Sequence, residues 1–453
     1  MAGHDSLLRR GTALGMLALA IFAPAARTQN SPASTTLFRA VRVFDGTRVL
    51  GVRDVLVSGG RIAQIGSGLN APTGATVVDG SGKTLLPGLI DAHTHSWGDA
   101  SRTALMFGVT TELDMFTDAT FARQARAEQA AGRATNRADL FSAGTLVTAP
   151  GGHGTEFGIP IPTISSPDSA QAFVDARIAE GSDYIKIVYD AGRTYGMTMP
   201  SISKATLQAV IAAAHGRDKL AVVHVGDYQS AREAIEAGAD GLVHLFLDRE
   251  PAADFAQLVA TRGAFVVPTL TVLRTLAGTG GGAPLASDPR IVPYLSRADS
   301  VALRQTFPPR PGARKLNDEP ARITVRQLRA AGVPILAGTD AGNPGTSHGA
   351  ALHRELELLV EAGLSAQEAL AAATSVPAKS FKLDDRGRIA AGLRADLLLV
   401  EGDPTADITA TRAIAGVWKQ GVPANRAQYA AELAAARQAA GKLPGGRRVG
   451  ARE

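Results

Sequence analysis

The chain has 453 residues, of which 45% are hydrophobic, and its mean hydropathy is +0.04. This is enough apolar material for a large buried core, but too mixed for a protein that crosses a membrane many times. Aromatic residues make up only 5% of the chain and no basic stretch is interleaved with them, so we expect no nucleic-acid partner. The net charge of +5 comes from the two ends of the chain and therefore says little about the substrate.

The first 26 residues are typical of an export signal. Arg9 and Arg10 precede the apolar run GTALGMLALAIFA, and Ala23-Pro24-Ala25 then supplies small residues for a cleavage site. Because the run is short for a membrane anchor, we expect a signal peptide over 1–26, a periplasmic or extracellular protein, and no stable membrane span after processing. A retained anchor is the alternative. The chain has no cysteine, so it can form neither a disulfide nor a thiolate metal site.

Short β-rich runs separated by glycine turns fill residues 37–86, and similar runs return over 384–425. Examples are LFRAVRVFDG near the start of the first segment and ADLLLVEGD in the second. Such runs are typical of hairpins. We therefore predict one small β-sandwich domain built from both ends of the chain.

The long middle segment, residues 87–383, alternates short apolar runs with helical stretches rich in alanine and charge. Its eight apolar runs are LLPGLIDAH, GVTTELDM, DLFSAGTLV, DYIKIVY, KLAVVHV, GLVHLF, GAFVVPTL and VPILAGTD. Eight alternations of buried strand and helix predict an α/β fold, a parallel (β/α)₈ TIM-like barrel. Residues 271–320 interrupt this rhythm with a Gly/Pro-rich insertion of the kind that forms lids or mobile loops. Residues 426–453 predict one Ala-rich helix and a disordered basic end.

Polar residues end five of the eight runs, where barrel enzymes place their catalytic groups. They are His93, His95, Lys186, His224, His244 and Asp340. Each strand histidine alone is more often a core residue than a ligand, but a lysine inside a buried strand must be paired or chemically altered. A chance arrangement of all six at strand ends is improbable, so we interpret them as one metal site. His215 and His353 lie in helical runs, and we expect them to be a surface residue and a structural residue.

Substrate contacts are harder to assign from the sequence. His153 follows the third run in a glycine-rich stretch, where it either contacts a carbonyl or carboxylate or only shapes the loop. Tyr228 follows His224 and either donates to a developing oxyanion or has no such role. Arg193 and Tyr195 follow the fourth run, and a substrate carboxylate is one partner for them, although loop arginines are usually solvated. His348, in a glycine-rich loop after Asp340, is a weaker candidate.

Several motifs resemble the amidohydrolase superfamily, and in particular its imidazolonepropionase-like branch, which includes dipeptidases cleaving Xaa-Pro or Xaa-Arg/Lys. The motifs are LPGLIDAHTH, YIKIV, AGTDAG, GGHG, HGAALHRELELLVEAGLSAQEALAAAT and GRIAAGLRADLLLVEGDP, together with the two strand-end histidines. The resemblance spans roughly residues 40–420. Imidazolonepropionase itself works with one metal and lacks the lysine of YIKIV, so Lys186 argues against that reaction.

The resemblance implies two divalent metal ions, most often zinc. His93, His95 and Asp340 would bind one metal, His224 and His244 the other, and Lys186 would bridge them as a carbamate. Imidazole and oxygen ligands suit zinc independently of the resemblance. The implied mechanism is attack by a metal-bridging hydroxide, with Asp340 taking the proton and passing it to the leaving amine.

Three functions follow. The first is an exported hydrolase of amide bonds, a dipeptidase or peptidase-like amidase whose partner is a small dipeptide or amide. The second keeps the site but acts on N-acyl amino acids, aryl amides, carbamates or lactones, since a fold does not determine a substrate. The third is a non-catalytic scaffold, which the filled ligand positions disfavour. A homo-oligomer remains open.

Overall fold

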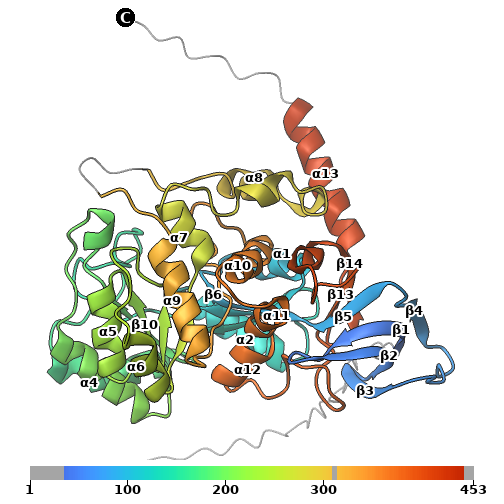
Figure 1. The fold of residues 1–453 in the computed structure, drawn as a ribbon, viewed down its shortest axis with the longest axis horizontal. Helices are drawn as coiled ribbons and strands as arrows, with labels where there is room; N and C mark the ends of the chain where they lie inside the picture. The colour runs from blue at the N-terminus through green and yellow to red at the C-terminus, as the bar shows by residue number, and fades with distance from the viewer. Residues whose placement is uncertain (1–34, 309–313, 443–453) are drawn as a thin grey trace, which may run out of the picture. The chain divides into compact units, whose positions relative to one another are not determined.

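The structure is a computed structural model that describes residues 35–308 and 314–442 (Figure 1). The predicted signal peptide over 1–26 and the basic end from residue 443 lie outside the described residues. Within the described ranges, every helix is too short or too polar to cross a bilayer.

Strands from both ends of the chain pair in one mixed sheet, which confirms the predicted association of the two β-rich segments. The spatial order is β15-β14-β13-β5-β1-β2-β3, with β4 also paired to β1. In the central contact β13 runs antiparallel to β5, so that Leu397 lies opposite Pro87 and Glu401 opposite Lys83. The strands are β1 (Thr36–Phe44), β2 (Val49–Ser58), β3 (Arg61–Gly66), β4 (Thr76–Asp79), β5 (Lys83–Pro87), β13 (Leu397–Glu401), β14 (Ile414–Lys419) and β15 (Val422–Pro423).

This sheet is buried on both faces where it meets the rest of the chain. In β13, Leu397 and Leu399 join a cluster that contains Phe38 and Trp418, whose rings meet edge to face at 4.7 Å. Leu398, of opposite parity, belongs to the larger core instead. A strand buried on both faces becomes a continuous apolar run, which is why this segment reads LLLV.

The middle segment contains two parallel sheets whose strands are buried on both faces. One has the order β6-β7-β8 and the other β12-β11-β10-β9. Their bounds are β6 (Leu89–Thr94), β7 (Val109–Asp114), β8 (Asp139–Ser142), β9 (Ile185–Tyr189), β10 (Ala221–Val225), β11 (Gly241–Val243) and β12 (Phe265–Val267). Seven of the eight predicted runs therefore form strands.

Single parallel bridges connect these two sheets in a closed cycle. Val147, just after β8, pairs with Ile187 of β9, while Ile335 pairs with Val266 of β12. The same segment then reaches β6, where Ala341 pairs with Thr94. The eighth predicted run thus occupies its place in the cycle through bridges and forms no named strand. Its ladder is short because Pro334 has no N–H and the Asp91 side chain accepts the N–H of Thr339.

Helices follow the strands as the alternation predicted. Side chains of Asp118, Ser203 and Asp227 cap α2, α4 and α5 by accepting backbone N–H groups of the first turn. The helices are α1 (Ala100–Met106), α2 (Ala119–Ala130), α3 (Ala170–Ala179), α4 (Lys204–His215), α5 (Tyr228–Glu236), α6 (Phe255–Thr261), α7 (Leu270–Leu276), α8 (Arg297–Ala302), α9 (Glu319–Ala330), α10 (Ala350–Glu361), α11 (Ala366–Ala372), α12 (Ser375–Ser380) and α13 (Arg426–Lys442).

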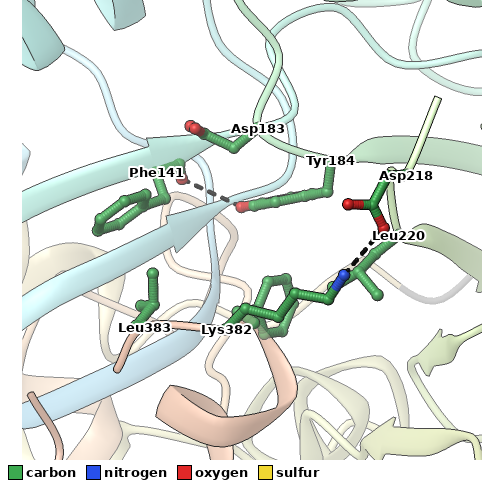
Figure 2. Close-up of a pocket in the computed structure, with 8 residues that line it drawn as sticks. Phe141, Asp183, Tyr184, Asp218, Leu220, Lys382 and Leu383 are labelled. Carbon is green, nitrogen blue, oxygen red and sulfur yellow. Dashed lines mark hydrogen bonds and ion pairs between the residues drawn. The ribbon is translucent and has the colours of Figure 1, made fainter. Parts of the chain in front are cut away.

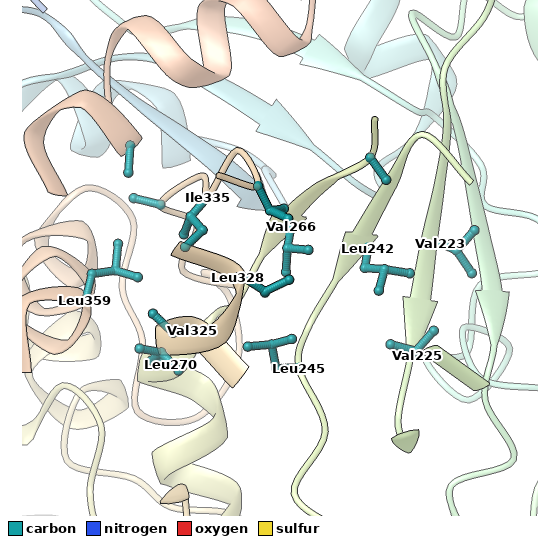
Figure 3. Close-up of a cluster of buried hydrophobic side chains, with 14 of the residues drawn as sticks. Val223, Val225, Leu242, Leu245, Val266, Leu270, Val325, Leu328, Ile335 and Leu359 are labelled. Carbon is teal, nitrogen blue, oxygen red and sulfur yellow. The ribbon is translucent and has the colours of Figure 1, made fainter. Parts of the chain in front are cut away.

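The main core lies between the second parallel sheet and its covering helices. Figure 3 shows Val223, Leu242 and Val266, one from each of three neighbouring strands, with Leu328 of α9 and Leu359 of α10 in the same cluster. All five side chains are fully buried. Burial of a leucine or valine contributes about 1.5–3 kcal/mol, so this packing holds the strands and orients their ends.

The insertion over 271–320 is anchored in its described part. After α7 it forms short turns of 3₁₀ helix and α8, and its residues Leu285, Ile291, Leu295 and Leu303 pack against Phe107 in a hydrophobic cluster of their own. These contacts show how the segment is attached to the rest of the chain. Its role as a lid stays a prediction.

A small pocket lies at the N-terminal ends of the parallel strands. Figure 2 shows Tyr184, immediately before β9, donating a hydrogen bond to the carbonyl of Phe141, with Leu220 and Leu383 nearby. In such barrels the N-terminal face generally contributes to stability, whereas the active site lies at the C-terminal face. None of the predicted metal ligands lines this pocket.

Candidate metal centre

Three of the predicted ligands lie close together at the end of β6. His93 and His95 share one face because strand side chains alternate with a period of two. Asp340 approaches them because its backbone N–H donates to the carbonyl of His93 at 2.8 Å. Its Oδ1 atom lies 3.3 Å from Nε2 of His93 and 3.0 Å from Nε2 of His95. The three residues offer ligand atoms that all lie within 4.8 Å of one another.

The burial of this group favours a cation between its members. Both ring nitrogens of His93 and Oδ1 of Asp340 are buried and have no hydrogen-bond partner in the described chain. Leaving such atoms unsatisfied costs about 1–3 kcal/mol each. A divalent metal bound by imidazole nitrogen and carboxylate oxygen would satisfy all three, so the donor set fits a metal such as zinc.

His224 and His244 lie beside this group. The ring centroids of His93 and His244 are 4.8 Å apart, and those of His224 and His244 are 4.5 Å apart. Nδ1 of His244 contacts the Thr269 hydroxyl at 2.7 Å, and Nε2 of His224 contacts a carboxylate oxygen of Asp190 at 3.4 Å. These contacts leave Nε2 of His244 and Nδ1 of His224 for a ligand, as in metal sites where the second nitrogen is held by a neighbour.

Lys186 enters the site from β9 and is buried. Its side-chain amine forms no hydrogen bond or ion pair with the described residues, although the charges of Asp340 and Asp114 act on it. Burial lowers the pKa of Lys186 to about 7, and these two carboxylates only partly oppose the shift. A fraction of the amine is therefore neutral and nucleophilic at neutral pH.

The protonation states of the other groups also suit cation binding. Burial lowers the pKa of His224 to about 4 despite its contact with Asp190, and it lowers the pKa values of His93 and His244 well below the usual range. Burial alone raises the pKa of Asp340, but its close contact with His95 and the nearby positive charges outweigh this and lower the pKa to about 2. The site thus presents neutral imidazoles and an ionised carboxylate.

Backbone strain occurs at this site. His244 has φ 70°, Asp340 has φ 58° and Thr269 has φ 52°, all in the left-handed region. Such conformations cost non-glycine residues about 1–3 kcal/mol and concentrate at functional sites. Here they place the two ligands and the hydroxyl that holds His244.

Buried carboxylates support the ligands from behind. Asp91 accepts hydrogen bonds from the backbone N–H groups of His93 and Thr339 and from the Thr339 hydroxyl, and so ties β6 to the residue before Asp340. Burial raises the pKa of Asp91 to about 7. Asp114 accepts from the backbone N–H of Ser96. These contacts position the group formed by His93, His95 and Asp340.

The predicted substrate residues divide into two sets. The His153 ring lies 4.8 Å from that of His224, and its Nδ1 contacts Glu156 at 2.5 Å. Burial, and then the charge of Asp190, raises the pKa of Tyr195. Tyr228 instead packs in the core.

Tyr228 has surroundings that differ from those expected of an oxyanion donor. Its ring lies 5.2 Å from Phe246 and 5.5 Å from Phe255, and its hydroxyl lies 3.4 Å from Nη1 of Arg232 on the same helix. These contacts involve none of the six predicted metal ligands. Its role as a donor stays a prediction, as does substrate binding by the exposed Arg193.

The remaining histidines have partners outside the metal group. His215 pairs with Asp240 at 2.9 Å on the surface, and His353 is buried with Nε2 2.9 Å from the carbonyl of Phe107. Nδ1 of His348 lies 2.8 Å from the buried carboxylate of Glu112. His215 and His353 thus have the surface and structural surroundings that their helical positions predicted.

Sequence reasoning missed three supporting residues, Asp91, Asp190 and Thr269. Asp91 lies two residues before His93, Asp190 follows the fourth apolar run, and Thr269 lies in the seventh run just after β12. The strand-end rule that found the histidines would have included the last two. Their partners could not be assigned without the contacts between neighbouring loops.

Residues 84–425 match the model of the amidohydrolase family. The chain belongs to the amidohydrolase family. It is therefore a hydrolase acting on carbon–nitrogen bonds, with a metal-binding group in His93, His95 and Asp340. Membership also implies the (β/α)₈ barrel that the eight apolar runs predicted.

Individual relatives of this amidohydrolase differ in substrate. It is 27% identical over 395 residues to an imidazolonepropionase of Cereibacter sphaeroides, which covers 82% of this chain and 94% of the relative. A Xaa-Pro dipeptidase structure with bound methionine in its active site superposes with a TM-score of 0.69 at 24% identity, over 86% of this chain and 99% of that one. Phenylurea hydrolase B superposes with a TM-score of 0.66 at 22% identity, over 87% and 97%. The two structures show a shared fold.

Proposed function

We propose that this amidohydrolase is an exported binuclear-metal enzyme that cleaves an amide bond, with a dipeptide or a peptide-like amide as its substrate. The observation that carries the proposal is the convergence of six side chains: three offer ligand atoms within 4.8 Å of one another, two are histidines whose rings lie beside them, and one is a buried lysine. They are His93, His95, Lys186, His224, His244 and Asp340. The predicted signal peptide supports the export part of the proposal.

Lys186 carries the proposal of a second metal. An unpaired buried ammonium is costly, whereas a carbamate formed from its neutral amine and carbon dioxide would be an anion able to bridge two dications. The free nitrogens of His224 and His244 would complete the second ligand set. Lys186 also argues against an imidazolonepropionase activity, because the family resemblance associates that reaction with one metal and no such lysine.

The residues of the chain suggest how the reaction proceeds. Bound divalent cations supply polarisation of the scissile carbonyl and a lowered pKa of water. Asp340, ionised and 3.0 Å from His95, accepts a proton from the attacking water and delivers it to the leaving amine. Thr269 and Asp190 hold the rings of His244 and His224 in fixed orientations.

A second candidate function keeps the same residues but changes the substrate to an N-acyl amino acid, an aryl amide, a carbamate or a lactone. The structural likeness to both a dipeptidase and a phenylurea hydrolase favours keeping this second candidate, because proteins of one fold can act on different substrates.

Metal analysis and a substrate panel test the proposal together. We expect close to two equivalents of zinc in the full protein, and a lower content in Lys186→Ala. The panel should contain a dipeptide library, N-acyl amino acids, aryl amides, carbamates and lactones. Turnover of dipeptides supports the first function. Turnover of aryl amides with no dipeptide accepted replaces it with the second, and a metal-free, inactive protein contradicts both.

A further inference from the structure

Three neighbouring aromatic side chains lie beside the site and are here called the aromatic ledge: Trp97, Phe116 and Phe157. They follow β6, β7 and β8, so they lie at the same strand ends as the metal ligands. The ring of Phe116 lies 6.4 Å from Trp97, edge to face, and 6.3 Å from Phe157. These separations are typical of interacting aromatic pairs.

The ledge adjoins both halves of the metal site. Nδ1 of His95 lies 3.3 Å from the carbonyl of Phe116, and the two rings are 6.5 Å apart. At the other end, the Phe157 ring lies 6.1 Å from His153, whose ring in turn stacks beside His224. A group resting on the ledge would therefore be held next to a bond placed between the two histidine sets.

The ledge is exposed above and anchored below. Trp97 is 41% exposed and Phe157 is 56% exposed, and these are the exposed aromatic side chains of the described chain. Phe116 is buried and packs with Leu146 and Val188. Exposed apolar surface beside a polar cleft marks binding sites, since its exposure to water is otherwise unfavourable.

We propose that the aromatic ledge binds an aromatic or large apolar group of the substrate, so that the enzyme selects amides that carry such a group near the scissile bond. The proposal rests on the proposed function for the bond that is cleaved, and it adds the substrate class. The ledge residues determine specificity, whereas the reacting atoms belong to the metal site.

Tryptophan fluorescence gives a readout that is independent of turnover. Trp418, the other tryptophan, is buried in the terminal sheet, so a ligand-dependent change should come from Trp97. The probes are N-acetyl-phenylalanine amide and N-acetyl-alanine amide, titrated into the full protein with and without zinc. We expect saturable binding of the first with a Kd roughly tenfold lower than that of the second.

Matched variants assign the signal. Trp97→Phe should abolish the fluorescence change, and Phe157→Ala should raise the Kd of the phenylalanine probe several-fold. Val52→Ala is the control, because Val52 is also 56% exposed but lies on β2 of the terminal sheet. Equal affinity for the two probes, or an equal effect of Val52→Ala, would overturn the proposal.

Kinetics separate the ledge from the proposed function. With any amide series that the enzyme hydrolyses, we expect kcat/KM to favour phenylalanine over alanine analogues, and Trp97→Ala or Phe157→Ala to remove most of that preference. Hydrolysis without aromatic preference overturns the ledge and leaves the function intact. Selective binding of the aromatic probe without hydrolysis of any amide overturns the proposed function and leaves the ledge proposal intact. If Trp97→Ala lowers the sedimenting mass without changing selectivity, the ledge is a contact between copies of the chain and the proposal fails.

Discussion

Two lysines are buried among the residues that the structure describes, and their surroundings differ. Lys419 of β14 donates to Asp139 and to Asp396, each at 2.9 Å. Lys186 of β9 has no such partner among the residues that the structure describes, and only more distant carboxylates act on it. The charge of Lys419 is balanced by carboxylates of the fold, whereas the amine of Lys186 is available to react.

The neighbours of each lysine extend this difference. Arg386 and Arg394 also contact Asp139, so the region around Lys419 is a paired ionic network that joins the terminal sheet to β8. Around Lys186, burial lowers the pKa values of His93, His224 and His244, and both ring nitrogens of His93 lack hydrogen-bond partners among the described residues. Burial of a charged side chain is therefore not a functional signal by itself, whereas burial without a partner is.

Replacing Lys186 by methionine should produce the largest effect. Lys186→Met cannot form a carbamate, so we expect turnover to fall to background and the metal content to decrease. With metal removed from both proteins, the melting temperature of the variant should equal or exceed that of the unmodified protein, because an unpaired buried amine is replaced by an apolar side chain of similar length. Calorimetry and metal analysis of the same preparation would measure both. If Lys186→Met retained turnover, Lys186 would have no catalytic role that distinguishes it from Lys419.

Asp340→Asn should keep much of the metal but lose proton transfer. We expect kcat to fall about 10²–10⁴-fold, the usual contribution of a general acid–base. The comparison of kcat with zinc content in one sample separates this effect from ligand loss. A normal kcat would show that another group carries the proton.

Lys419→Met should have the opposite profile to Lys186→Met. Removing it leaves Asp139 and Asp396 with fewer cations, and breaking a buried pair costs about 3–5 kcal/mol of unfolding free energy. Turnover per mole of folded, zinc-loaded protein should not change. Denaturant unfolding with parallel assays would check both, and unchanged stability would contradict a structural role.

Acid should narrow the stability difference between Lys419→Met and the unmodified protein. Burial raises the pKa of Asp139, but the charges of Lys419, Arg394 and Arg386 outweigh it and lower the pKa below the usual value. A depressed pKa stabilises the fold above the unfolded value of about 3.9 and loses this contribution as the pH falls. Unfolding measured from neutral pH downward should show convergence of the two proteins.

The sequence was sufficient to predict the pairing of the two chain ends, the succession of buried strands and the strand-end positions of the candidate ligands. Those predictions depend on periodicity and on the order of elements, which are local. The eighth run was less regular than predicted, because Pro334 and the side chain of Asp91 interrupt its ladder.

Predictions that depend on side-chain direction were less informative. Tyr228 was proposed as a donor from its proximity to His224 in the sequence; as the first residue of α5 it packs its ring against Phe246 and Phe255, and its role as a donor stays a prediction. The ledge residues Trp97 and Phe157 were likewise not distinguishable from ordinary loop aromatics, because their exposure and mutual contacts arise only when three loops meet.

Thr269→Val should give the smallest effect and the sharpest test of how the ligands are held. The substitution keeps the shape and branching of the side chain but removes the hydroxyl that contacts Nδ1 of His244 at 2.7 Å. Because loss of such a supporting contact typically reduces metal affinity or activity about 10–100-fold, we expect zinc to dissociate faster and activity to recover at high zinc. Thr271→Val, whose hydroxyl instead contacts Glu355, is the matched control. Equal losses in both variants would mean that the hydroxyls matter for packing alone, and that His244 needs no support beyond its strained backbone.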